Sequence, residues 1–243
     1  PFVAHAALGP SCALAEMRDG HLTLWSHGQG MHPLRNALSA AMDLDVGDIT
    51  AHHLHGPGCY GHNGADDAAL DAALIAREIP DHCIRVQWRR EEEFGFEPLG
   101  TAMQVNLRVA LDALGRPMDW TTELWSGVHV QRPGSGGRLL AASALGKPLA
   151  HLTVADPPQT RGGGATRNAI PIYALPAHRI DHHLVPDLAL RTSALRGLGA
   201  LPNVFAIESM MDELALLAGE DPLQYRLALL ADPRARYILE RVA

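Results

Sequence analysis

The chain has 243 residues, a formal net charge of −7 and 47% hydrophobic residues. This hydrophobic content is enough for a sizeable core and argues against an intrinsically disordered chain. The negative charge, with no cluster of Lys and Arg between aromatic residues, argues against a nucleic-acid partner, because binding phosphates needs a concentrated basic face.

The first hundred residues predict an alternation of strands and helices. Apolar and polar residues alternate on both sides of Arg18-Asp19-Gly20, which predicts a hairpin. Apolar residues at helical spacing predict one helix in GMHPLRNALSAAMDL and another from about Ala65 to Ile79. Asp66 and Asp67 suit the start of the second helix, where the helix dipole is positive. Short strands are predicted at DITAHHL and HCIRVQW.

The remainder predicts a long hairpin, an irregular region and a helical end. Two long strands are expected around Leu114-Gly115-Arg116-Pro117, and one more strand at HRIDHHLV. Residues 131–168 are rich in Gly and Pro, which predicts long loops of the kind that contact a substrate. Asn203 is predicted to cap a helix that Gly219 ends, and two further helices follow, the first starting at Asp221-Pro222.

This order of elements favours an α+β fold with mixed, largely antiparallel sheets packed with helices over a regular parallel sheet. We expect a single domain over residues 1–243, with a division into two lobes, about 1–100 and 101–243, left open. No apolar run approaches the roughly 18 to 20 residues of a membrane helix, so no transmembrane segment is expected. Cysteine is sparse, which fits the cytoplasm, but a periplasmic location stays open.

A glycine loop, Gly56-x-Gly58-x-x-Gly61, lies between a predicted strand and a predicted helix, as in dinucleotide-binding domains. The hairpin before it and the antiparallel strands after it argue against a nicotinamide domain. Histidines also surround the loop, but His53 and His55 share one strand face while His52 points to the other. Without an HExxH motif or paired cysteines, no metal bound directly by side chains is expected.

Four segments in register resemble one protein family: WSHGQGMHPLRNALSAAM, HGPGCYGHNGADDAALDAALIAR, LRTSALRGLGALPNVFAIESMMDELA and DPLQYRLALLADPRAR. They are similar to the molybdopterin-binding large subunit of the xanthine dehydrogenase and aldehyde oxidase family, in the branch of isoquinoline 1-oxidoreductase-like beta subunits. The resemblance implies the first molybdenum-cofactor-binding domain only, a fragment of a longer subunit. It implies molybdopterin, as a dinucleotide, carrying molybdenum.

The same resemblance implies an enzyme, a molybdenum hydroxylase that introduces water-derived oxygen into an aldehyde or an N-heterocycle. Its implied partners are that small-molecule substrate, an iron–sulfur small subunit that accepts the electrons, and the remaining domain of the large subunit. The family's glutamate base lies in a Gly-Glu motif near the C-terminus of the large subunit, and the resemblance implies that this motif is outside the present chain; Glu97 does not match it by position. The catalytic residue is therefore unknown, and the isolated chain is expected to be inactive.

Matching the motifs residue by residue gives the candidate site. Gln29 matches a glutamine that hydrogen-bonds a molybdenum oxo group, and Tyr60-Gly61 matches an aromatic-Gly pair beside the metal. The implied cofactor-binding residues are Gln29, Gly58, Tyr60, Gly61, Ala194, Leu195, Arg196 and Gly197. Leu195 and Leu198 replace flanking aromatics of the xanthine-oxidising members, which implies a wider or more aliphatic substrate site. Arg167 and Leu198 are the candidate substrate residues.

Two alternatives of other classes remain at this stage. A non-catalytic scaffold or interaction fragment would use the glycine loop only as a turn. An NAD-binding dehydrogenase would use it to hold a pyrophosphate at the helix start. Molybdenum content separates the first alternative from the hydroxylase, and binding of NAD that is lost on Gly61→Val would favour the second.

Overall fold

The structure is a computed structural model that describes residues 1–131, 139–146, 155–186 and 188–243. The chain forms two compact units, each built from more than one stretch of sequence. Unit 1 comprises Pro1–Thr101, His129–Ala155 and Leu188–Arg196. Unit 2 comprises Ala102–Val128, Asp156–Asp187 and Gly197–Ala243.

Unit 1 contains a four-stranded sheet in the order β3-β2-β1-β4. Its strands are β1 (Cys12–Arg18), β2 (His21–Ser26), β3 (Ile49–His53) and β4 (Ile84–Gln87). Strand β1 pairs antiparallel with β2 and β4, whereas β2 pairs parallel with β3. The parallel pair places the ends of β2 and β3 at the same edge of the sheet, and the two loops of interest leave from that edge.

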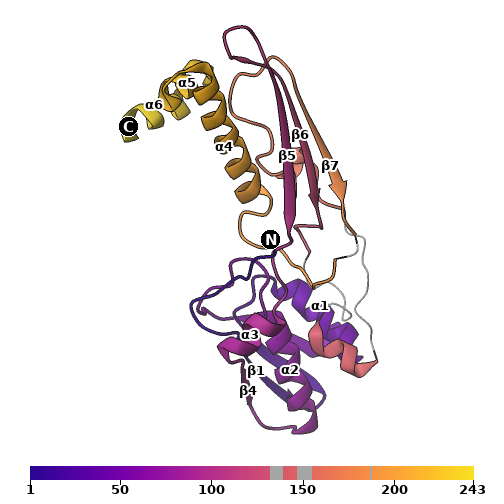
Figure 1. The fold of residues 1–243 in the computed structure, drawn as a ribbon. Helices are drawn as coiled ribbons and strands as arrows, with labels where there is room; N and C mark the ends of the chain where they lie inside the picture. Colours follow the sequence, from indigo (N-terminus) through magenta and orange to yellow (C-terminus); the bar gives the residue numbers. More distant parts are fainter. Residues whose placement is uncertain (132–138, 147–154, 187) are drawn as a thin grey trace. The chain divides into compact units, whose positions relative to one another are not determined.

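Two helices, α1 (Met31–Met42) and α2 (Ala65–Glu78), complete the core of unit 1 (Figure 1). Alternate residues of β1 and β2 point inward, so that Ala15, Leu22 and Leu24 are fully buried. They pack with the apolar faces of both helices in one cluster. Four alanines of α2 belong to this cluster, and their small side chains let the helix backbone approach the sheet closely.

A third helix of unit 1, α3 (Arg90–Phe96), was not predicted from the sequence. Its run of three glutamates shows no apolar periodicity, and only Glu93 of the helix is buried. The helix starts with a capping box in which the backbone N–H of Arg89 donates to Glu92 Oε2 at 2.7 Å. Local capping and the buried Glu93, rather than an apolar stripe, therefore define this helix.

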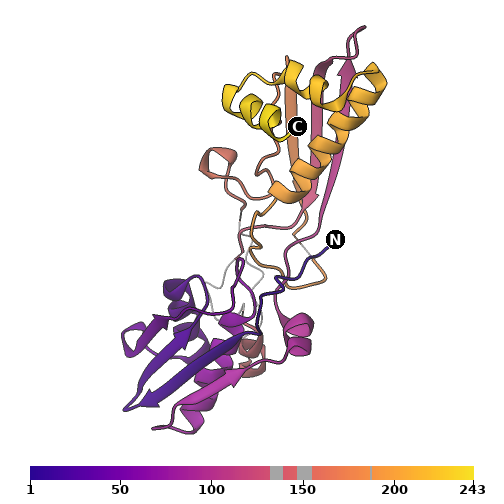
Figure 2. The same cartoon turned by 90° about the vertical axis from the view of Figure 1, so that its left-hand side faces the viewer.

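Unit 2 contains a three-stranded sheet in the order β5-β6-β7. Its strands are β5 (Met103–Leu111), β6 (Pro117–Ser126) and β7 (His178–Leu184). Its helices are α4 (Ala200–Ala218), α5 (Pro222–Leu229) and α6 (Pro233–Val242). Helix α4 lies along β5 (Figures 1 and 2). Its buried residues Ile207 and Met211 pack with Trp120 and Tyr225. Strand β6 pairs antiparallel with β5 and parallel with β7.

The α+β class and the mixed sheets are confirmed, since both antiparallel and parallel pairings occur in each sheet. The predicted end of α4 at Gly219 and the Asp221 cap of α5 are also confirmed. The prediction that Asn203 caps α4 is wrong, because the helix begins at Ala200. The Asn203 side chain instead donates to the carbonyl oxygens of Ala165 (2.7 Å) and Arg167 (2.9 Å).

The predicted loop region 131–168 is only partly described, because residues 132–138 and 147–154 lie outside the described residues. Its described parts include two short 3-10 helices, η3 (Leu140–Leu145) and η4 (Gln159–Arg161). Another such turn, η1 (Val46–Asp48), precedes β3. Across the described parts of the chain, we find no helix that is both long and apolar enough to cross a membrane.

Candidate functional site

Two loops of unit 1 lie against each other at the edge where β2 and β3 end. The first contains Gln29 and follows β2, and the second is the glycine loop that follows β3. The backbone N–H of Leu54 donates to the carbonyl oxygen of Ser26 at 2.9 Å and starts the contact. A β-carbon added to Gly56 would lie 2.4 Å from His27 Cβ, so only glycine allows this approach. The sequence therefore uses Gly56 to pack one loop on the other.

The glycine loop has an unusual backbone at three of its positions. Gly58, Tyr60 and Gly61 have φ values of +99°, +51° and +126°. The Tyr60 ring folds back over Gly58, where an added β-carbon would meet Tyr60 Cζ at 2.8 Å. A non-glycine residue with positive φ, such as Tyr60, costs free energy that the surrounding contacts must offset. The loop is thus held in one conformation by its neighbours.

The segment Ala194–Arg196 supplies those neighbours, although it lies far from the loop in the sequence. The backbone N–H of His62 donates to the Ala194 carbonyl at 2.8 Å, and that of Arg196 donates to the Tyr60 carbonyl at 2.7 Å. These two bonds form an antiparallel bridge between Gly61 and Leu195. Seven of the eight predicted cofactor-binding residues lie in unit 1, all except Gly197.

The side chains around this bridge differ in what they offer to a ligand. Gln29 and Arg196 are exposed, and within the described residues no hydrogen bond occupies either side chain. Tyr60 is half-buried, and Leu195 packs its side chain onto Gly100, where an added β-carbon would meet Leu195 Cδ2 at 2.6 Å. An amide and a guanidinium are donors that suit anionic oxygens. The free donors therefore fit an anionic cofactor such as a pterin carrying molybdenum.

Hydrogen bonds between buried polar groups hold the end of the glycine loop in place. His62 Nδ1 lies 2.8 Å from Asp66 Oδ2, and both side chains are buried. The Asn63 side-chain oxygen accepts from the Cys59 thiol (3.0 Å) and from the backbone N–H of Ala65 (3.0 Å). From the sequence, the histidines around this loop are considered only as possible metal ligands. The spacing of four between His62 and Asp66 at a helix start is the signal that would have indicated this pair.

The Cys59 thiol gives a direct test of this arrangement. Burial raises its pKa to about 11, and Asp66 adds to the shift while the backbone of Asn63 opposes it. At pH 8 about one thiol in a thousand is then ionised. We expect iodoacetamide to label the exposed Cys83 far faster than Cys59 in the folded protein, as measured by peptide mass spectrometry. Equal labelling rates in the native state, with both rates rising together in denaturant, would contradict the described loop.

The other predicted residues lie in unit 2, because the chain passes between the units from Arg196 to Gly197. Gly197 and Leu198 have φ values of +90° and +54° and form the turn before α4. The next residue, Gly199, donates its N–H to the Gly164 carbonyl at 3.1 Å. This bond and those of Asn203 place the segment that carries Arg167 beside the start of α4.

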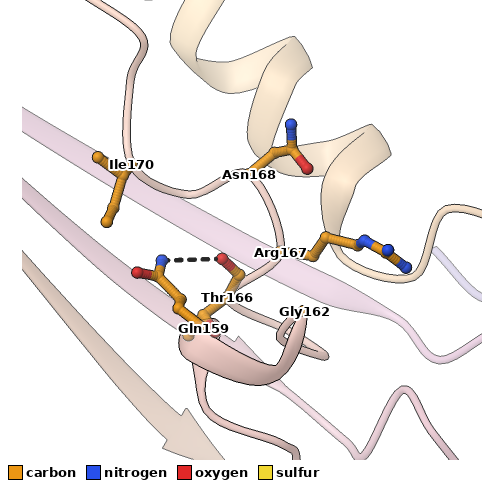
Figure 3. Close-up of a pocket in the computed structure, with 6 residues that line it drawn as sticks. All are labelled: Gln159, Gly162, Thr166, Arg167, Asn168 and Ile170. Carbon is orange, nitrogen blue, oxygen red and sulfur yellow. Dashed lines mark hydrogen bonds between the residues drawn. The ribbon is translucent and has the colours of Figure 1, made fainter.

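A shallow pocket of about 340 Å³ lies on this glycine-rich segment of unit 2. It is lined by Gln159, Gly162, Thr166, Arg167, Asn168 and Ile170 (Figure 3). The Gln159 amide donates to the Thr166 carbonyl at 3.0 Å and closes one side of the pocket. Figure 3 shows the exposed Arg167 side chain extending away from Gln159. Its guanidinium is therefore available to a carboxylate or a phosphate.

The histidines near the glycine loop do not assemble a metal site. The rings of His53 and His55 lie 6.1 Å apart, whereas His52 stacks on Trp25 at 5.7 Å. In the described ranges, no group of three or more His, Cys, Asp or Glu side chains is arranged to hold a metal ion. The antiparallel pairing of β1 with β2 and β4 also differs from the parallel sheet of a nicotinamide-binding domain.

Comparison with known proteins identifies the class to which this fold and these loops belong. The chain is a member of the molybdopterin cofactor-binding domain family, whose pattern matches residues 1–130 and 153–229. The predicted resemblance is thereby confirmed, and a molybdenum-bearing pterin is the cofactor that the family implies.

Particular relatives agree with this assignment. A nicotinate dehydrogenase subunit of Pseudomonas putida is 35% identical over 243 residues, which are 100% of this chain and 19% of that protein. The beta subunit of isoquinoline 1-oxidoreductase of Brevundimonas diminuta is 24% identical, over 100% of this chain and 29% of that protein. The aldehyde oxidoreductase of Desulfovibrio gigas shares the fold, with a TM-score of 0.69 at 17% identity, over 99% of this chain and 26% of that chain.

The chain thus spans less than a third of the length of these relatives. The relatives named as subunits belong to assemblies, and all three are named as oxidoreductases or dehydrogenases. The activity, substrate and partners of this protein are therefore a matter for proposal.

Proposed function

We propose that this chain is the first cofactor-binding domain of a molybdenum hydroxylase that acts on an N-heterocycle or an aldehyde. The observation that carries the proposal is the bridge of Tyr60–His62 with Ala194–Arg196, which holds Arg196 at the glycine loop. The loop that contains Gln29 packs on the same glycine loop, and within the described residues the side-chain donors of Gln29 and Arg196 are unoccupied. The bound cofactor supplies the two-electron redox chemistry, and the protein binds and orients it.

Each residue near the bridge has a separate role in this proposal. The Gln29 amide and the Arg196 guanidinium donate hydrogen bonds to the anionic cofactor. In this proposal the Tyr60 hydroxyl contacts the substrate, and Gly58, half-buried under the Tyr60 ring, keeps the loop backbone in its conformation beside the cofactor. Gly197 continues this binding segment into unit 2. An iron–sulfur subunit that accepts the electrons and a second cofactor-binding domain with the base would complete the enzyme.

Within this substrate class we propose a heteroaromatic carboxylate as the substrate. Two features support this proposal. The most identical of the relatives described above is named a nicotinate dehydrogenase, and nicotinate is a pyridine carboxylate. Arg167 offers an exposed guanidinium fork that binds a carboxylate through two parallel hydrogen bonds. Leu198 would then contact the apolar part of the ring.

The test is the molybdenum content of the chain expressed with its flanking reading frame and partner subunits. We expect near-stoichiometric molybdenum, and about tenfold less or lower in a Gln29→Ala, Arg196→Ala double variant, since each lost bond to a charged group costs about 1.5–3 kcal/mol. Gln104→Ala with Arg241→Ala, which replaces exposed residues on β5 and α6, is the matched control and should retain the metal.

A folded, metal-free complex made with an intact cofactor pathway would overturn the hydroxylase proposal. The scaffold function would then account for the chain, with the glycine loop acting only as a turn. Equal loss of molybdenum in the double variant and in its matched control would instead show that Gln29 and Arg196 have no specific role in binding the cofactor.

A further inference from the structure

The N-terminal segment Val3–Ser11 lies against the glycine loop of unit 1. The Leu8 N–H donates to the Pro57 carbonyl of the glycine loop at 3.0 Å. A β-carbon on Gly9 would lie 2.9 Å from Pro57 Cβ, so the two backbones are in close contact. The segment also pairs with Gly100 through two backbone bonds at Val3, of 3.1 and 2.8 Å.

Helix α3 anchors the same segment from the other side. Arg90 donates to the Ala7 carbonyl at 2.7 Å, and the Ser11 hydroxyl donates to Glu93 at 3.2 Å. The backbone N–H of His5 donates to Glu97 Oε1 at 3.0 Å, at the end of the helix. The segment is therefore fixed on α3 and in turn contacts the glycine loop.

The His5 side chain contacts the Ala194 carbonyl, which accepts a hydrogen bond in the bridge between residues 60–62 and 194–196. His5 Nε2 lies 3.1 Å from the Ala194 oxygen, and His5 Nδ1 lies 3.5 Å from Glu97 Oε2. The side chains of His5 and Glu97 have no exposed surface. The Ala194 oxygen thus receives a side-chain donor in addition to the His62 N–H at 2.8 Å.

The partners of the ring fix the position of its protons. A carbonyl oxygen only accepts hydrogen bonds, so Nε2 must carry a proton. Nδ1 lies 3.5 Å from Glu97 Oε2, and within the described residues neither of these two atoms has a hydrogen-bond partner. The imidazole therefore presents a fixed N–H to Ala194.

We propose that His5, oriented by Glu97, is a positioning residue that holds the Ala194–Arg196 segment in the conformation that binds the cofactor. The inference rests on the proposed function, and it adds a site that contacts neither the cofactor nor the substrate. Because Ala194 is bonded to the loop residue His62 and to His5, the ring couples the N-terminal segment to both sides of the bridge.

Two matched double variants isolate the donor to Ala194. His5→Gln with Glu97→Gln keeps an amide N–H near the position of Nε2, whereas His5→Met with Glu97→Gln has a similar shape without a donor. Both lack a buried charge, so they differ mainly in the bond to Ala194. They are prepared as the complete subunit with its partners, next to the wild-type protein and an exposed-histidine control, His82→Ala.

The readouts are amide hydrogen exchange of the peptides covering Tyr60–Asn63 and Ala194–Arg196 without cofactor, and the electron paramagnetic resonance signal of the partly reduced molybdenum. We expect the glutamine double variant to match the wild type in both. In the methionine double variant, exchange should rise about 5- to 10-fold, the worth of one hydrogen bond, and the molybdenum signal should shift or broaden.

Identical exchange and identical spectra in the two double variants would overturn the positioning role, and so would an equal loss of folded protein in both. These outcomes differ from failure of the proposed function, in which the wild-type protein itself carries no molybdenum. In that case the exchange difference alone still decides whether His5 holds the bridge.

Discussion

Replacing Gly61 by alanine is expected to abolish stable incorporation of molybdenum. A β-carbon at this position would lie 1.9 Å from the Ala194 oxygen and 2.8 Å from its carbonyl carbon, well inside contact distance. Both atoms belong to the backbone, so no side-chain rotation relieves the clash. The φ of +126° adds strain of about 1–3 kcal/mol for any residue with a β-carbon. The bridge to Leu195 must therefore open.

The measurement is molybdenum content together with hydrogen exchange at His62 and Arg196, whose N–H groups form the bridge. Gly20→Ala is the matched control, because Gly20 also has a positive φ, of +80°, but nothing lies within 4 Å of its added β-carbon. That variant should lose only about 1 kcal/mol of stability and keep the metal. A Gly61→Ala protein with wild-type molybdenum and wild-type exchange would refute the described bridge.

The sequence predicts the local elements of this fold well and its long-range contacts poorly. The hairpin around Gly20, the helix after the glycine loop and the end of α4 at Gly219 each follow from a periodic or capping signal within a few residues. Asn203 shows the limit of such signals. Asparagine suits both a helix cap and a bond to distant carbonyl oxygens, and only the fold reveals that it bonds to Ala165 and Arg167.

The candidate site also depends on long-range contacts that local sequence signals do not predict. Gln29, Tyr60 and Arg196 are found from motifs, because each lies in a short recognisable segment. The contact between the Tyr60 and Arg196 segments depends on backbone bonds between residues 60–62 and 194–196, and periodicity carries no information about such a pairing. The support from His5 could not be predicted, since it requires α3, a helix without an apolar stripe. The residues that orient a site are harder to predict than those that face it.

A second long-range contact, the ion pair of Asp67 and Arg191, is expected to have the largest effect on stability. The guanidinium binds both carboxylate oxygens at 2.9 Å, and Asp67 also accepts from the Leu140 N–H at 2.8 Å. Arg191 donates further to the Phe96 carbonyl at 2.6 Å. Asp67 is 1% exposed, so Asp67→Ala leaves a largely buried cation without its carboxylate. We expect a loss of about 3–5 kcal/mol in the free energy of unfolding, measured in urea.

Two further variants test whether the loss of stability is specific to this buried ion pair. Glu240→Ala breaks the exposed pair with Arg236 and should cost less than about 1 kcal/mol. Asp67→Leu with Arg191→Met removes both buried charges and should recover most of the loss, because the desolvation cost disappears with them. Arg191 lies three residues before Ala194, so Asp67→Ala should also loosen the cofactor bridge and raise exchange at Arg196. If Asp67→Ala unfolds at the same urea concentration as Glu240→Ala, Asp67 does not fix the segment that carries the site.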